Sequence, residues 1–61
     1  MASLADRITK SVRKRLSEIP KVDDSIALDI IIDMVFEDKE SKKLSNAEIS
    51  TLIDKIFYKT N

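Results

Sequence analysis

The chain has 61 residues, with 11 basic and 11 acidic side chains and a formal net charge of zero. A chain of this length forms one domain at most and buries only about 60% of its unfolded surface, so such domains often need a disulfide or a metal ion. This chain has neither Cys nor His, which excludes a disulfide and the usual zinc ligands. Its stability must come from helix propensity, from packing, or from a partner that covers apolar surface.

Charge is distributed unevenly along the chain. Residues 1–21 carry six basic and two acidic side chains, whereas residues 22–40 carry one basic and seven acidic ones. This dipolar pattern favours intramolecular or protein–protein charge pairing over tight nucleic-acid binding. No apolar run approaches the roughly 20 residues of a membrane span. We expect a soluble, cytoplasmic protein without membrane contact, and the Lys-rich, Cys-free composition is typical of thermophilic proteins.

The first predicted helix covers residues 3–19. Its apolar side chains repeat at spacings of four and three, which places them on one helical face: Leu4, Ile8, Val12, Leu16 and Ile19. Ser3 can cap its start. Pro20 ends it, because proline disfavours helical geometry in the residue before it.

The second predicted helix covers residues 24–38 and contains the longest apolar run of the chain, Ile26–Phe36. Its polar positions Asp29, Asp33 and Glu37 fall in one narrow stripe. A surface helix needs an apolar stripe of only about 100°, so this helix is central to its fold or shared with a partner. Capping oxygens and negative charge precede it at Asp23, Asp24 and Ser25.

The third predicted helix covers residues 46–59. Ser45 and Glu48 have the spacing of a capping box, with Leu44 and Ile49 at the staple positions. The preceding residues 37–43 include no apolar side chain and are expected to form a solvated loop or an exposed helical turn.

These elements predict an all-α fold, a three-helix bundle with helices at about 3–19, 24–38 and 46–59. Both connections are short enough to join antiparallel neighbours. We expect one domain over residues 1–61.

The sequence contains no recognisable set of catalytic residues. His and Cys are absent, and no Ser or Thr has a candidate base beside it. The row of Asp29, Asp33 and Glu37 has the oxygen ligands of a divalent cation site, but a solvated acidic stripe is the simpler interpretation. We therefore predict a protein that is not an enzyme and has no cofactor and no metal.

Basic side chains cluster on the first helix and are expected to form an outward electrostatic docking face: Arg7, Lys10, Arg13, Lys14 and Arg15. A phosphate backbone could also reach such a face. A helix-turn-helix is disfavoured, since the connection before the third helix is longer than the usual three or four residues. Contact with nucleic acid is therefore expected to be indirect or weak.

Three aromatic side chains are the predicted apolar anchors for a partner: Phe36, Phe57 and Tyr58. Two flanking helices cannot cover an apolar helix on all sides, and exposed aromatics beside charged rims anchor protein interfaces. The alternative for Phe36 and Phe57 is that they pack on each other and close the core.

Three segments carry a resemblance to a known family: Lys10–Leu16, Asp23–Asp33 and Leu44–Ile49. In these segments and in composition the chain resembles the small helical accessory subunit of the archaeal, particularly crenarchaeal, replicative family-B DNA polymerase holoenzyme. The resemblance implies a non-catalytic subunit that binds the polymerase and modulates its stability or activity. It rests on no diagnostic motif, so no residue role is transferred.

The leading hypothesis is a non-enzymatic protein–protein interaction module, an accessory subunit of a larger complex such as a DNA replication complex. Its expected partner is a larger protein subunit, for example a DNA polymerase. One alternative is a small DNA-binding regulator of archaeal, viral or plasmid origin, in which two copies pair through the second helix. Another is a self-associating structural protein that forms a homodimer and has no other partner.

Overall fold

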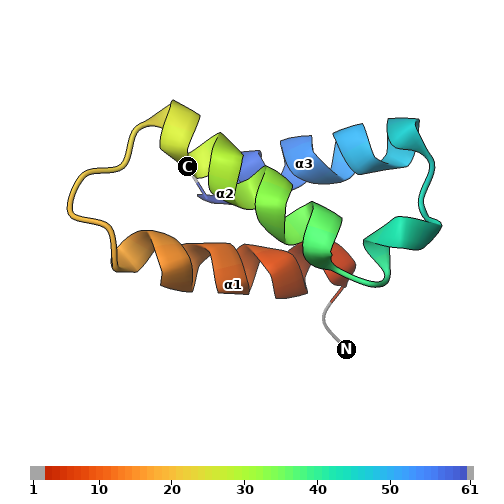
Figure 1. The fold of residues 1–61 in the computed structure, drawn as a ribbon, viewed down its shortest axis with the longest axis horizontal. Helices are drawn as coiled ribbons and strands as arrows, with labels where there is room; N and C mark the ends of the chain where they lie inside the picture. The colour runs from red at the N-terminus through yellow and green to blue at the C-terminus, as the bar shows by residue number, and fades with distance from the viewer. Residues whose placement is uncertain (1–2, 61) are drawn as a thin grey trace.

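A computed structural model describes residues 3–60 (Figure 1). Over this range the elements are α1 (Leu4–Ser17), α2 (Asp24–Glu37), the short 3-10 helix η1 (Ser41–Lys43) and α3 (Asn46–Thr60). Along the colour ramp of Figure 1, α2 runs back across α1 in the opposite direction, and each α-helix packs against the other two. The prediction of an all-α three-helix bundle is confirmed. Within the described range, no helix combines the length and the apolarity needed to cross a bilayer.

The helix starts follow the predicted caps. The Ser3 hydroxyl accepts from the backbone N–H of Asp6 at 3.1 Å, and the Asp23 carboxylate accepts from that of Ile26 at 2.8 Å. At α3 the capping box is formed in both directions. The Ser45 N–H donates to the Glu48 carboxylate at 3.0 Å, and the Glu48 N–H donates to the Ser45 hydroxyl at 3.2 Å.

The first helix ends two residues before the predicted boundary. The N–H groups of Glu18 and Ile19 donate to carbonyls three residues back, on Arg15 and Leu16. This tight final turn leaves the helix before Pro20, which disfavours α geometry in Ile19. The prediction that α1 ends before Pro20 is therefore correct. The two-residue difference arises because residues 18 and 19 form a tight final turn and do not continue the α-helix.

The core lies along the centre of the bundle and draws from all three helices. Its buried apolar side chains are Ala5, Ile8 and Val12 from α1, Ile31 and Val35 from α2, and Leu52 and Ile56 from α3. Half-buried residues close it from the sides, including the staple pair Leu44 and Ile49. The periodicity of α1 therefore identified its buried face correctly.

The segment between α2 and α3 is less solvated than its sequence indicates. Ser41 is buried, at 1% exposure, and begins η1 instead of lying in a loop. Asp38 causes this turn, because its carboxylate accepts from the backbone N–H of Glu40 at 2.9 Å and folds the chain back. The expectation of a solvated loop or exposed turn is wrong for Ser41.

Ion pairs of α1 hold the C-terminal ends of the other two helices. Both terminal nitrogens of Arg7 donate to the carboxylate of Asp38, at 2.7 and 3.1 Å, just beyond α2. The last turn of α2 has no basic residue of its own, so Arg7 supplies the cation that a helix C-terminus favours. At α3, Arg13 Nη2 donates to the Lys59 carbonyl at 2.6 Å, and the Lys59 ammonium pairs with Asp6.

We expect these contacts to make the fold less stable in acid. The hydrogen bond from Arg7 is the main cause that lowers the pKa of Asp38 below the ordinary 3.8, and the hydrogen bond from Lys59 does the same to the pKa of Asp6. The folded protein then binds these protons less readily than the unfolded chain. Their contribution is complete well above pH 3.8 and is lost as the pH falls through the lowered values.

Urea unfolding at several values between pH 6 and pH 2 tests this pH dependence. The free energy of unfolding should fall towards low pH, and the Asp38→Asn variant should show a shallower fall, because one of the linked carboxylates is gone. An identical pH profile for Asp38→Asn and the wild type would show that the pair with Arg7 has no part in it.

Candidate protein-interaction surfaces

The three predicted aromatic anchors have different environments. Phe57 is half buried and packs against the core, as the alternative interpretation expected for it. Phe36 is 57% exposed on α2 and Tyr58 is 86% exposed on α3. Phe36 and Tyr58 are therefore available to a partner, whereas Phe57 mainly packs against the core of the bundle.

The five predicted basic residues also divide into two groups. The side chains of Arg7 and Arg13 are engaged within the chain, at Asp38 and at the Lys59 carbonyl. The side chains of the other three are exposed and form no hydrogen bond or ion pair among residues 3–60: Lys10, Lys14 and Arg15. Internal pairing thus reduces the predicted docking face on α1 to these three cations.

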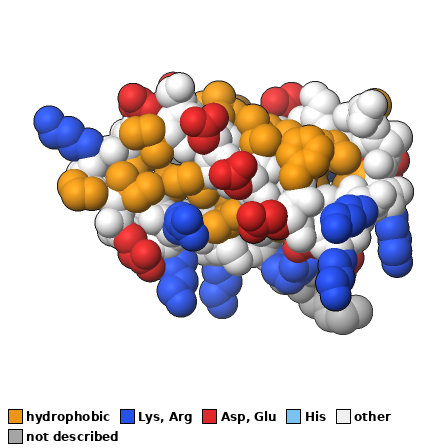
Figure 2. All heavy atoms as spheres, viewed as in Figure 1, with side chains coloured by type: hydrophobic (Ala, Val, Ile, Leu, Met, Phe, Trp, Pro, Cys, Tyr) orange, Lys and Arg blue, Asp and Glu red, His pale blue; other side chains and the backbone are white. Residues whose placement is uncertain are grey.

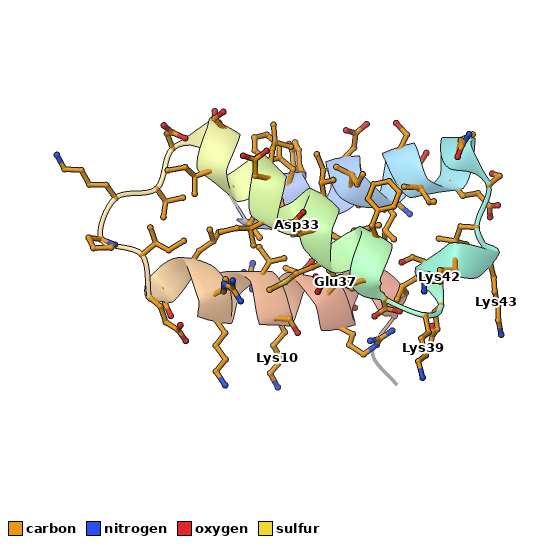
Figure 3. All side chains as sticks on the ribbon, in the orientation of Figure 1. Lys10, Asp33, Glu37, Lys39, Lys42 and Lys43 are labelled. Carbon is orange, nitrogen blue, oxygen red and sulfur yellow. The ribbon has the colours of Figure 1, made fainter. Side chains whose placement is uncertain are left out.

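The acidic stripe predicted on α2 is present, and we call Asp29, Asp33 and Glu37 the acidic row. All three side chains are exposed, and none has an ion-pair partner within residues 3–60. Figure 2 shows acidic side chains crossing this face diagonally with apolar surface on both sides, and Figure 3 places Asp33 and Glu37 on the viewer's side of α2. Across the described residues, no group of acidic side chains is arranged to hold a metal ion.

An apolar strip on α2 faces away from α1. Ile32 is 37% exposed and lies one turn before Phe36. Residues two apart on a helix point about 200° apart, so these two side chains lie opposite Ile30 and Met34. We call Ile32 and Phe36 the aromatic strip.

A second apolar surface follows the seam between α1 and α2, and we call its residues the apolar band: Val22, Ile26, Ile30 and Met34. Val22 is 43% exposed and Ile26 is 37% exposed, while the other two are half buried. Three shallow hollows of about 230, 100 and 250 Å³ follow the seam, and all three are lined by Met34. Ile30 also lines one of them, so the α1-side end of the apolar band, at Ile30 and Met34, borders these hollows.

None of the apolar band was among the predicted site residues. Its signal in the sequence is the spacing of four between its members, which indicates a ridge along one side of a helix. The same spacing also describes a buried face, so the pattern alone could not distinguish core from surface. In the structure, Ala27, Ile31 and Val35 are the residues of α2 that enter the core.

Comparison with known proteins adds no assignment: no protein-family model, curated protein or solved structure matches this chain. The resemblance to the polymerase accessory subunit thus stays a prediction.

Proposed function

We propose that the chain is a non-enzymatic protein–protein interaction module that acts as an accessory subunit of a larger complex. The observation that supports this most directly is the aromatic strip, where Phe36 leaves more than half of its surface in solvent beside Ile32. Aromatic side chains at the centre of an interface, with charges around them, supply most of the binding energy in protein complexes. The acidic row provides the charged rim along one side of this strip.

The resemblance described above makes the specific form of this proposal an accessory subunit of a DNA polymerase. In such a complex the aromatic strip would hold the larger subunit, and the free cations on α1 would guide the encounter. Because Arg7 and Arg13 hold the bundle together, Lys10, Lys14 and Arg15 are the cations available for this second role.

The second candidate, a small DNA-binding regulator, is favoured by one feature of the surface. Figure 3 shows Lys10 projecting from α1. Lys39, Lys42 and Lys43 project from the segment between α2 and α3, which lies near the N-terminal end of α1. All four side chains are exposed and form no ion pair within the described range. Such an edge could follow a phosphate backbone, with binding that weakens steeply with salt.

Purification of the tagged full-length chain from its native host, with nuclease treatment, tests the proposed function. We expect a larger protein chain to co-purify in stoichiometric amount from the wild type. Phe36→Ser should reduce its recovery at least about tenfold, since truncation of a central aromatic anchor costs about 2 kcal/mol or more.

Tyr58→Ser and Lys55→Ala serve as companions to Phe36→Ser. Tyr58→Ser asks whether the exposed tyrosine is a second anchor, and Lys55→Ala controls for loss of an exposed side chain on α3. Equal recovery of the larger chain with the wild type and Phe36→Ser would reject the aromatic strip as its binding site. Co-purifying material that disappears entirely with nuclease would favour the DNA-binding regulator instead.

A further inference from the structure

The apolar band lies between two groups of unpaired charges of opposite sign. On its α2 side is the acidic row, and on its α1 side are Lys14 and Arg15, which we call the basic edge, with the single acidic residue Glu18 beside them. Arg15, Asp33 and Glu37 line the same hollow over Met34, and both residues of the basic edge line the next one. Over residues 3–60, no ion pair satisfies any of these charges. This face therefore has a net positive charge on its α1 side and a net negative charge on its α2 side, and the two meet across Ile30 and Met34.

We propose that this face binds a second copy of the chain in a two-fold symmetric dimer. Since α1 and α2 lie side by side and antiparallel, a two-fold axis parallel to them places α1 of one protomer over α2 of its partner. The basic edge of each protomer then meets the acidic row of the other, and this contact occurs twice. The two apolar bands meet at the axis, where they are removed from water.

Charge selects this orientation over the other two-fold arrangement. An axis that lies in the plane of the interface but perpendicular to the helices would place α1 over α1 and α2 over α2. The two acidic rows would then face each other, as would the two basic edges, and like charges across an interface repel. A face with positive charge on one side and negative charge on the other is thus complementary to itself only when the two-fold axis is parallel to the helices.

The dimensions of the face suit a stable dimer. The bundle measures 33 × 24 × 18 Å, and Figures 2 and 3 view it down the shortest axis, so Asp33 and Glu37 lie on its broadest side, with apolar surface beside the acidic side chains. A standard interface buries roughly 800 Å² on each partner, so a dimer of that size would use most of this side of the bundle. A net charge of zero also leaves no overall repulsion between copies.

The dimer goes beyond the proposed accessory role and shares charged residues with it, because the acidic row, Lys14 and Arg15 take part in both. It uses the side of α2 that faces α1, whereas the aromatic strip lies on the opposite side. The apolar contacts of the two proposals are therefore separate, and Phe36→Ser and Ile26→Asp test them independently.

Sedimentation equilibrium of the full-length chain at several concentrations provides the first test. We expect a dimer at about 100 μM chain, because interfaces of standard size hold with micromolar or tighter dissociation constants. Ile26→Asp should raise the dissociation constant at least tenfold. This variant keeps the fold, since Ile26 is in the first turn of α2, where a carboxylate is favourable.

Charge reversal and mixing provide the decisive test. Lys14→Glu/Arg15→Glu makes both charged sides of the face negative, and Asp33→Lys/Glu37→Lys makes the α2 side positive. Each variant alone should dimerise at least tenfold more weakly than the wild type. Mixed in equal amounts, the two should form a heterodimer, because each meets opposite charge on both sides.

Lys42→Glu/Lys43→Glu is the matched control, because it makes the same change of charge on the segment between α2 and α3, outside this face, and should leave dimerisation unchanged. Circular dichroism checks that each variant is helical. A wild-type chain that stays monomeric at the concentrations above would overturn the dimer, as would charge variants that dimerise like the wild type or fail to pair when mixed. Loss of the larger subunit in the Phe36→Ser experiment concerns the proposed function and leaves this test unaffected.

Discussion

Replacement of Ile31 by alanine is expected to lower the free energy of unfolding by about 2 to 5 kcal/mol. Ile31 is fully buried at the centre of α2, and its truncation leaves a cavity between all three helices as well as losing buried apolar surface. A chain of this length has a total stability of roughly 3 to 9 kcal/mol. The loss is therefore a large fraction of the total, and the variant should unfold at a clearly lower urea concentration than the wild type.

Urea unfolding followed by circular dichroism measures this loss, and Ile32→Ala is its matched control. Ile32 is the next residue along the same helix, with the same side chain, and is 37% exposed. Its replacement should cost clearly less than that of Ile31, because more than a third of the residue is already in water and alanine has the higher helix propensity. Equal losses for the two variants would mean that α2 is rotated away from the core contacts described here.

The pair Ile31 and Ile32 also shows where prediction from sequence reaches its limit in this chain. The side chains of α1 are amphipathic, so their periodicity identifies one buried face, and the structure buries Ile8 and Val12 as expected. In α2 almost every non-acidic position is apolar. The pattern then predicts a helix but cannot choose which of several apolar faces enters the core.

Contacts between residues far apart in the chain could not be predicted from local sequence patterns, for a different reason. Arg7 and Asp38 are 31 positions apart, and Arg13 and Lys59 are 46 apart. Helical spacing assigns each of these residues to a face of its own helix, but pairing depends on how the helices pack in three dimensions. The predicted docking cations therefore included two arginines that the fold uses internally.

The charged side chains of α1 help to explain how a small bundle without disulfides keeps its helices in register. Arg7 reaches the C-terminal end of α2, while Arg13 and Asp6 reach the C-terminal end of α3. Apolar packing alone tolerates sliding and rotation of helices, whereas a bidentate arginine contact requires one geometry. The same division leaves the remaining cations of α1 unpaired and available for an interface.

The helix caps were the most predictable part of the fold. We expect that loss of the capping box of α3 also lowers the free energy of unfolding. Ser45→Ala is expected to lower the free energy of unfolding by about 1 kcal/mol. The substitution removes the hydroxyl that accepts from the Glu48 N–H at 3.2 Å, and leaves that donor at the helix start without its partner. For a domain of this size such a loss lowers the melting temperature by roughly 4 to 8 °C.

Thermal unfolding of Ser45→Ala should be compared with that of Ser50→Ala, which makes the same substitution at an exposed position inside α3. Ser50→Ala should be neutral or slightly stabilising, because alanine has the higher helix propensity and no cap is lost. Equal melting temperatures for the two variants would mean that the capping box does not stabilise α3. A selective loss in Ser45→Ala would instead show that the hydrogen bonds between Ser45 and Glu48 stabilise the start of α3.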